Sequence, residues 1–556
     1  MTSEFLQVAT VIFLHLDEDF GRRVASWLET PQSKEETSED EDINDGSEGP
    51  PPPHPHLNQL PSKMDLQASL SLIFFTFTAV FSLFSLSLFI IRYNPCCNCE
   101  VCTAFITRSW TSEFVNLSDW YTHLLRKSPT GTIHVHVLNN IITANPDNVE
   151  YIIKKNFDNY PKGKAFSDIL GDLLGRGIFN VDGNCWRFQR KLASLELGSL
   201  SIRSHALNIV VEEIETRLIP IFKTVADNDA VLDLQDVFRR LSFDSICKFS
   251  FALDPGSLKP SLPVSELESA FDLSSKLCAE RGVTPSPLVW KIKRLFNIGS
   301  EKELKRSINV VKRMAGRVIK ERREKGFGSG NDLLSRFMGS ISDDDYLSDI
   351  VISFLLAGRD TVASALTTFF LLLTQNPKVL EKIRQESDRV IGGSNDSLPT
   401  FGDLQHLHYL QAALHESMRL YPPVQFDSKF SNQDDVFPDG TFVKRGSRVT
   451  YHPYAMGRME RIWGSDSMEF KPERWIRDGE FKQESAYKYP VYQGGVRVCL
   501  GKEMSLVEMK SVALSLIRRF DVKVVDPDRI LRFAPGLTAT VSGGLHAVVR
   551  RREVPE

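Results

Sequence analysis

Long hydrophobic runs predict two helices before any motif is considered. Residues 66–91 (LQASLSLIFFTFTAVFSLFSLSLFII) contain no charged side chain. Because about 20 apolar helical residues suffice to cross a bilayer, this run predicts a membrane anchor. A buried core helix is the alternative, but soluble helices of this length without a polar face are rare. Residues 353–373 (SFLLAGRDTVASALTTFFLLL) predict a long apolar helix that is interrupted by Gly358, Asp360 and Thr361, which a buried helix normally avoids.

The hydrophobic pattern divides the chain into four segments. Residues 1–63 carry an acidic run (KEETSEDEDINDGSEG) and a proline cluster, a composition typical of disorder. Because Met64 stands directly before the anchor, an alternative is that translation begins there. Residues 64–92 are assigned to the transmembrane anchor and residues 93–109 to a juxtamembrane hinge. Residues 110–556 predict a single domain, mainly α with small β-sheets, because no linker or repeat divides them.

Composition narrows the choice of partners. The 556 residues include 67 Lys and Arg against 71 Asp and Glu, a net charge of -4, so no nucleic-acid partner is indicated. Eight cysteines in a chain of this length are no disulfide framework, which indicates a reducing compartment. The segment NPCCNCEVC has spacings that zinc ligands favour, but a second pair of ligands is missing. A hinge with palmitoylatable cysteines is the favoured interpretation.

The candidate chemistry centres on a glycine-rich loop, YQGGVRVCLGKEM, that leads into a helix. A thiolate binds iron, and free backbone N–H groups, a nearby arginine and a helix N-terminus stabilise negative sulfur. Cys499 has Arg497 before it and Gly501 after it. Gly494, Gly495 and Gly501 are expected to let the backbone approach a flat ligand where any side chain would collide.

This loop resembles the signature of the cytochrome P450 superfamily, an aromatic residue followed by Gly, Arg, Cys and Gly at fixed offsets, here Tyr492, Gly495, Arg497, Cys499 and Gly501. Tyr492 stands where phenylalanine is usual, and Val496 stands where proline is common. The resemblance implies the single-domain P450 fold and makes Cys499 the axial ligand of the iron in haem b (iron protoporphyrin IX). Thiolate donation in this superfamily favours O–O cleavage.

Two further motifs occur in the order that the resemblance requires. Asp360 and Thr361 match the acid–alcohol pair of the superfamily, in which a local helix distortion opens a groove, the threonine faces the reacting oxygen and the acid relays protons. Glu416 and Arg419 lie three residues apart on a predicted helix, and Arg474 follows in KPERW. These three residues resemble the structural charge network that shapes the haem pocket, and the network is not assigned a catalytic role.

A third motif, GNCWRFQRKLAS, places Trp186 and Arg190 at helical spacing. Together with Arg497 they resemble the donors to the haem propionates, since charge-assisted bonds from arginine to carboxylate are strong. Taken alone, the tryptophan and the arginine would indicate ordinary packing and a solvated charge.

Longer segments, among them FDNYPKGKAFSDILGDLLGRGIFNVDG and TYHPYAMGRMERIWG, resemble the plant cytochrome P450 family 94, and most of all its C subfamily. The resemblance implies a haem-thiolate monooxygenase that oxidises the terminal (omega) carbon of a carboxylic acid, foremost 12-hydroxylation and carboxylation of jasmonoyl-isoleucine in jasmonate catabolism. A fatty acid omega-hydroxylase is one alternative. A haem-thiolate hydroperoxide isomerase or lyase is another, and Thr361 argues against it because such enzymes typically lack this threonine.

A substrate with one carboxylate, oxidised at its apolar end, needs a narrow apolar channel with a basic anchor far from the iron. Arg176 and Lys429 are the candidates for that anchor. Charges that are solvated or that face the propionates are the alternative interpretation of both residues.

Electrons must come from another protein, because the chain has no flavin or dinucleotide motif. The resemblance implies NADPH-cytochrome P450 reductase and O2 as partners. Arg187, Lys191 and Lys502 are candidates for a basic docking surface on the side of the cysteine ligand. We expect a single-pass protein of the endoplasmic reticulum membrane with a cytosolic catalytic domain. The glycosylation sequons at Asn116 and Asn395 should then remain unmodified.

Overall fold

The computed structural model describes residues 71, 74–82, 99–198, 200–259, 261, 265–284, 286–326, 332–392 and 399–553. The chain divides into two compact units, Met1–Asn98 and Cys99–Glu556. In the first unit, residues 74–82 are helical, and the side chains of Phe74 and Phe77 are exposed. Apart from these residues and residue 71, the predicted anchor lies outside the described residues, as does the sequon at Asn395.

The second unit is mainly helical, which confirms the predicted fold class. Its α-helices are α4 (Glu100–Thr107), α5 (Leu117–Lys127), α6 (Pro146–Glu150), α7 (Gly163–Leu174), α8 (Gly183–Leu197), α9 (Leu200–Glu213), α10 (Ile219–Asp227), α11 (Leu234–Phe251), α12 (Glu266–Val283), α13 (Pro287–Phe296), α14 (Gly299–Lys325), α15 (Leu333–Met338), α16 (Asp344–Gln375), α17 (Pro377–Ile391), α18 (Phe401–His406), α19 (His408–Leu420), α20 (Pro453–Met456), α21 (Glu460–Trp463) and α22 (Lys502–Arg519). Polar caps begin several of them: the Asp343 carboxylate, for example, accepts the N–H of Tyr346 at the start of α16.

Small sheets join distant parts of the chain. The largest has the strand order β1-β2-β7-β4, formed by β1 (Thr132–Val135), β2 (Asn140–Thr143), β7 (Arg448–Tyr451) and β4 (Asp427–Phe430). Strands β2 and β7 are parallel, and the other two pairs are antiparallel. A second sheet has the order β10-β13-β3, and three two-stranded ribbons complete the unit: β10 (Phe520–Val524), β13 (His546–Arg551), β3 (Val231–Asp233), β5 (Asp435–Val436), β6 (Phe442–Val443), β8 (Ile476–Arg477), β9 (Glu480–Phe481), β11 (Phe533–Ala534) and β12 (Thr540–Val541).

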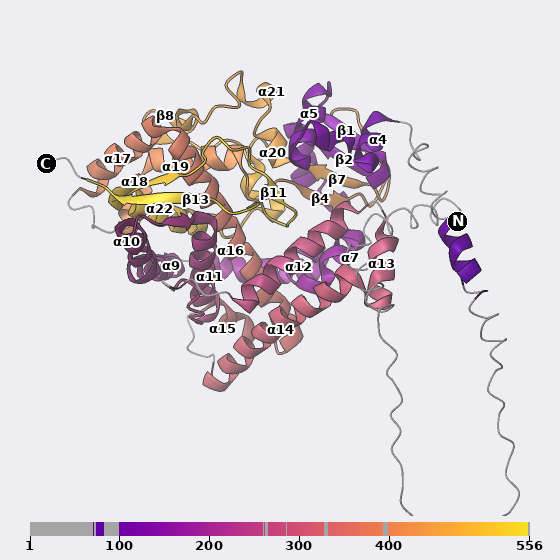
Figure 1. Ribbon diagram of the computed structural model, residues 1–556, viewed down its shortest axis with the longest axis horizontal. Helices are drawn as coiled ribbons and strands as arrows, with labels where there is room; N and C mark the ends of the chain where they lie inside the picture. Colours follow the sequence, from indigo (N-terminus) through magenta and orange to yellow (C-terminus); the bar gives the residue numbers. More distant parts are fainter. Residues whose placement is uncertain are drawn as a thin grey trace, which may run out of the picture. The chain divides into compact units, whose positions relative to one another are not determined.

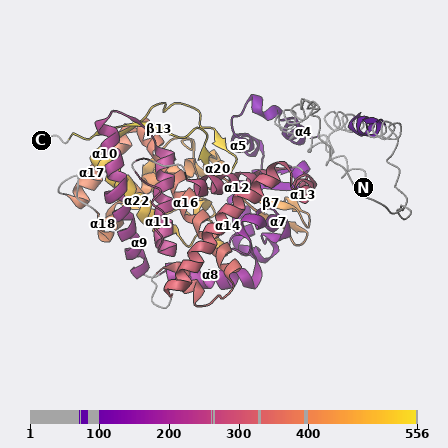
Figure 2. The ribbon, with the colours of Figure 1, turned by 60° about the horizontal axis from the view of Figure 1, so that its bottom comes forward.

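Helix α16 passes through the middle of the second unit, between α11 and α12 in both views (Figures 1 and 2). It is the one helix among the described residues that is long and apolar enough to span a membrane, and 72% of its most apolar stretch is buried inside the protein. This burial makes it a core helix. Gly358 allows α11 to approach, since a Cβ at this position would lie 2.5 Å from side-chain atoms of Ile246.

The predicted interruption of this helix at Gly358, Asp360 and Thr361 is wrong, because α16 is α-helical without a break. The Thr361 hydroxyl donates to the carbonyl of Ala357, one turn earlier, at 2.7 Å. The Asp360 carboxylate pairs with Arg359 at 3.2 Å. Both polar side chains are therefore satisfied without any unwinding of the helix.

Residues 99–109 of the predicted hinge belong to the second unit. The Cys99 sulfur accepts the N–H of Cys102 at the start of α4, and Cys102 itself is buried, where its sulfur accepts the N–H of Val137 at 3.4 Å. Cys96 and Cys97 lie outside the described residues. Within the part of the chain that the structure describes, no group of three or more His, Cys, Asp or Glu side chains is placed to hold a metal ion.

The Asn116 side chain connects the start of α5 to a C-terminal segment. Its amide nitrogen donates to the carbonyl of Leu531 and to the carboxylate of Asp119, both at 2.8 Å, and its oxygen accepts the N–H of Phe533 at 2.8 Å. The sequon asparagine is therefore buried and fully hydrogen-bonded in the folded unit.

Candidate active site

The cysteine loop closes on itself before α22 begins. The Cys499 N–H donates to the carbonyl of Tyr492 at 2.8 Å. The thiol is accessible, yet desolvation by the surrounding protein raises its pKa, against the opposing effects of the Gly501 N–H and the Arg190 charge. An accessible sulfur with dense protein around it lines a recess in the fold. Such a thiol ionises when it coordinates a cation.

The glycines before the cysteine are required by packing. Gly495 has a φ of +59°, and a Cβ there would overlap the carbonyl oxygen of Ile153 in the π-helical turn η3 (Tyr151–Lys155). A Cβ at Gly494 would lie 2.9 Å from the Ile153 side chain. The close approach of η3 requires both glycines, and their role beside a flat ligand stays a prediction. A Cβ at Gly501 would have the Cys499 sulfur, at 3.9 Å, as its nearest neighbour.

Two arginines and a tryptophan gather beside this loop. The Arg497 guanidinium lies 4.5 Å from the centroid of the Trp186 ring. Burial lowers the pKa of Arg190, and the nearby Arg497 lowers it further, while Cys499 acts in the opposite direction. Arg497 donates to the Asp182 carboxylate at 2.6 Å and to the Val181 carbonyl at 3.0 Å.

The Nε–H group of Arg497 is buried and has no acceptor among the described residues. A buried donor of this kind is costly unless a ligand satisfies it, and a carboxylate is the acceptor that arginine binds best. Trp186 contacts Arg497, and the charges of Arg190 and Cys499 act on each other, so these residues fit a haem group held through its iron and its propionates.

The acid–alcohol pair of α16 is part of a buried charge network. Asp360 is buried, which raises its pKa, while the neighbouring Arg359 lowers it. Arg359 also pairs with Asp272 of α12 at 2.5 Å, and Asp272 pairs with Arg239 of α11 at 3.0 Å. Asp272 is partly exposed, so the network reaches from Asp360 toward solvent. The motif indicates Asp360 but not Asp272 and Arg239, because these outer members of the network come from two other helices.

The structure brings Glu416, Arg419 and Arg474 together. The Glu416 carboxylate accepts from Arg419 at 2.7 and 2.8 Å, from Arg474 at 3.2 Å and from the Trp475 indole at 2.8 Å. Glu416 and Arg419 are completely buried. Sequence reasoning missed Trp475, which directly follows Arg474.

The two candidate carboxylate anchors lie in different surroundings. Arg176 is half exposed and pairs with Asp343 at 2.6 Å. Lys429 is buried on β4 and pairs with Asp427 at 2.9 Å; the same carboxylate accepts from Lys162 at 2.5 Å and from the Tyr451 hydroxyl at 2.8 Å. Each candidate thus already has a carboxylate partner. Their role in substrate binding stays a prediction.

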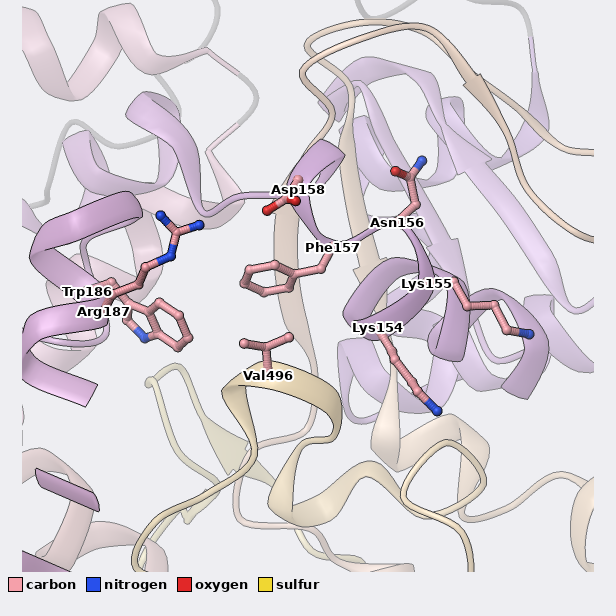
Figure 3. A pocket seen from close by; sticks show the side chains of 8 residues that line it. All are labelled: Lys154, Lys155, Asn156, Phe157, Asp158, Trp186, Arg187 and Val496. Atoms are coloured by element: carbon pink, nitrogen blue, oxygen red, sulfur yellow. The ribbon is translucent and has the colours of Figure 1, made fainter. Parts of the chain in front are cut away.

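A surface cavity of about 300 Å³ lies between η3, α8 and the cysteine loop. In Figure 3, Phe157 and Val496 face each other in its middle, with Trp186 and Arg187 on one side and Lys154 on the other. Arg187 and Lys191 are exposed, and the Lys502 ammonium donates to the Gln483 side chain. A positively charged surface thus lies beside the cysteine loop, and its role as a docking surface stays a prediction.

Comparisons with known proteins identify the class. Residues 113–543 match the cytochrome P450 family. Cytochrome P450 94C1 of Arabidopsis thaliana is 60% identical over 498 residues, which cover 88% of this chain and 100% of that protein. Cytochrome P450 94B3 of Arabidopsis thaliana is 48% identical over 451 residues (78% and 88%), and cytochrome P450 94A1 of Vicia sativa is 42% identical over 452 residues (78% and 86%). The chain belongs to the cytochrome P450 family and, within it, to family 94.

Family membership confirms the resemblance seen in the sequence and makes the chain a cytochrome P450 monooxygenase. It implies a haem iron with a thiolate ligand, a role that Cys499 fits by its place in the fold. It also implies O2 and a reductase as partners of the reaction.

Proposed function

We propose that this monooxygenase oxidises the terminal carbon of an extended carboxylic acid, with jasmonoyl-isoleucine as the foremost substrate. The observation that carries this proposal is that Asp360 and Thr361 stand on the core helix α16 of a chain that is 60% identical to a family 94 protein. Members of family 94 act on carboxylic acids at the end remote from the carboxylate, and the C-type members carry the 12-hydroxy conjugate to the 12-carboxy form.

The residues of the site have distinct roles in this proposal. Haem bound through Cys499 supplies the activation of O2 and the cleavage of an unactivated C–H bond. Trp186, Arg190 and Arg497 would hold the propionates, and the unpartnered Arg497 Nε would donate to one of them. The Thr361 hydroxyl, bonded only to its own helix, is free to turn and pass a proton from Oγ1.

Asp360 connects that hydroxyl to a proton supply. Its carboxyl is held by Arg359, which is paired with the partly exposed Asp272. Because desolvation favours the neutral carboxyl and Arg359 favours the charged one, Asp360 is poised between donor and acceptor. A hydroperoxide isomerase needs no such supply of protons, so the pair favours a monooxygenase.

A fatty acid omega-hydroxylase of cutin, suberin or defence lipid synthesis is the second candidate, because the same mechanism serves either acid. In both cases NADPH-cytochrome P450 reductase is the proposed source of electrons. It is proposed to dock beside Arg187, Lys191 and Lys502. Residues 64–92 are the proposed anchor in the endoplasmic reticulum membrane, with the catalytic unit in the cytosol.

Product analysis tests the proposal. The full-length enzyme is reconstituted with the reductase and NADPH and offered jasmonoyl-isoleucine, its 12-hydroxy form and a C18 fatty acid in parallel. We expect NADPH-dependent formation of the 12-carboxy conjugate. Turnover of the fatty acid alone would move the function to lipid synthesis, and turnover of a hydroperoxide without NADPH would overturn the monooxygenase mechanism.

A further inference from the structure

The proposed substrate carries a carboxylate, and the structure contains a partly buried cation that has no carboxylate partner among the described residues. Arg448 begins β7 in the largest sheet. Its Nε donates to the Ser428 hydroxyl at 2.9 Å, and its Nη1 donates to the carbonyl of Gly282 at 2.7 Å. Among the described residues, no carboxylate oxygen lies within 4.0 Å of this guanidinium, and Nη2 has no hydrogen-bond partner.

Strand geometry places Arg448 on the face of the sheet opposite Lys429. Strands β4 and β7 pair with Ser428 opposite Thr450 and with Phe430 opposite Arg448. Because successive side chains of a strand point to opposite faces, Ser428 and Arg448 share one face, and Lys429 and Asp427 share the other. The Lys429 face is also that of Tyr451, which bonds Asp427 and Gln493 of the cysteine loop. On that face Lys429 already has a carboxylate partner, which it shares with Lys162.

On the face of Arg448 the contacts are neutral. A hydroxyl and a carbonyl oxygen carry only partial charge, so the guanidinium is left largely uncompensated. Burial lowers its pKa, and the nearest opposing effects come from the Tyr121 hydroxyl and from Asp427 across the sheet. A partly desolvated guanidinium without a counter-ion attracts an anion more strongly than a guanidinium in bulk water. An anionic ligand would complete this site.

Helix α12 sets the distance between this site and the reacting end. Near its start, Asp272 pairs with Arg359, the residue before Asp360. Near its end, the carbonyl of Gly282 accepts from Arg448. The ten residues between positions 272 and 282 span about 15 Å at the helical rise. A carboxylate at Arg448 is thus far from Thr361, as omega oxidation of an extended acid requires.

We propose that Arg448 binds the carboxylate of the substrate and thereby sets which carbon reaches the reacting centre. This inference rests on the proposed function and replaces Arg176 and Lys429 as anchors. Nη2, which has no partner among the described residues, supplies the hydrogen bond to the carboxylate. The recognised chemistry is an extended monocarboxylic acid, whether fatty acid or amino-acid conjugate.

The test compares an acid with its methyl ester in wild-type enzyme and in Arg448→Gln. Binding of a C18 acid and of its methyl ester is titrated by the shift of the haem absorbance band. Because hydrogen bonds to charged groups are strong, Arg448→Gln should weaken acid binding roughly 10- to 100-fold. The ester should lose less than about threefold, since it has no charge to lose. The oxidised position should also spread from the terminal carbon to its neighbours.

Two variants separate binding from structure. Arg477→Gln removes an exposed arginine that pairs with Glu484 outside the proposed site, and it should leave both dissociation constants nearly unchanged. Arg448→Lys keeps the charge and should retain part of the preference for the acid. If Arg448→Gln fails to bind haem, the ratio of acid to ester affinity in Arg448→Lys decides, and a ratio equal to that of the wild type overturns the proposal.

Equal weakening of acid and ester in Arg448→Gln would mean that the residue supports the fold rather than the carboxylate, and unchanged acid binding would likewise overturn the anchor. Either result would leave the proposed function standing if the wild type oxidises carboxylic acids with reductase and NADPH. A wild type that oxidises none of them would overturn the proposed function itself.

Discussion

Arg419 is completely buried and Arg448 partly buried, and the surroundings of the two arginines differ. Arg419 makes five hydrogen bonds, two of them to the Glu416 carboxylate and three to backbone carbonyls. Arg448 makes two, both to neutral oxygens. A saturated buried ion pair leaves no donor for a ligand, so Arg419 can only hold the fold together. The incomplete set around Arg448 is what a binding site requires before its ligand arrives.

Removing the carboxylate at the saturated centre should have the largest effect on stability. Glu416→Ala leaves Arg419 buried without its counter-ion, while Arg474 keeps Asp466, and breaking a buried pair in this way costs about 3–5 kcal/mol. We expect little folded, haem-containing protein, as measured by urea denaturation and by the absorbance band of the carbon monoxide complex. A loss below about 1 kcal/mol would show that the network is not saturated as the contacts indicate.

Asp427→Asn should have an intermediate effect. It removes the negative charge that Lys162 and Lys429 share but keeps an oxygen that can accept a hydrogen bond, so we expect a loss of about 1–3 kcal/mol in the free energy of unfolding. The preference for acid over ester should persist, because Arg448 lies on the other face of the sheet. Loss of that preference would place the carboxylate on the Lys429 face instead.

Thr361→Val should affect chemistry far more than stability. Its hydroxyl bonds only the Ala357 carbonyl of its own helix, so the free energy of unfolding should change by less than about 1 kcal/mol. Product formed per NADPH consumed should fall roughly tenfold or more, as expected when a proton-transfer group is lost. Unchanged coupling of NADPH to product would remove Thr361 from the proposed proton path.

Arg477→Ala should have the smallest effect and serves as the surface reference for the series. Arg477 is mostly exposed and pairs with Glu484 at 2.8 Å. Exposed pairs of this kind contribute about 0–1 kcal/mol. Denaturation and ligand titrations should both match the wild type, and a larger loss would show that exposure is a poor guide to the energetics of charge in this protein.

The sequence predicts those parts of the site that a short motif carries. Cys499, the pair Asp360 and Thr361, and the Glu416–Arg419 spacing are all visible because their neighbours along the chain define them. The predicted helix break at Thr361 is wrong, because polar side chains alone do not distort a helix. A hydroxyl that bonds the carbonyl one turn earlier needs no such distortion.

Arg448 escapes sequence reasoning because its decisive property is the absence of a partner. Its two contacts come from β4 and from the end of α12, and the strand pairing that joins β2 to β7 unites distant parts of the chain. A local signal did exist for Lys429: Asp427 precedes it by two residues, and residues two apart in a strand share a face. That spacing predicts a paired lysine rather than a free anchor.

The Asn116 side chain is hydrogen-bonded to the backbone of Leu531 and Phe533. These two residues follow Asn116 by 415 and 417 positions in the sequence. At the usual rate of synthesis, those partners emerge roughly 20–80 s after the asparagine does. The sequon is therefore open during translation and closed in the folded enzyme. A sugar on Asn116 would therefore show that the nascent chain entered the lumen. After folding, Asn116 cannot be glycosylated unless the protein unfolds.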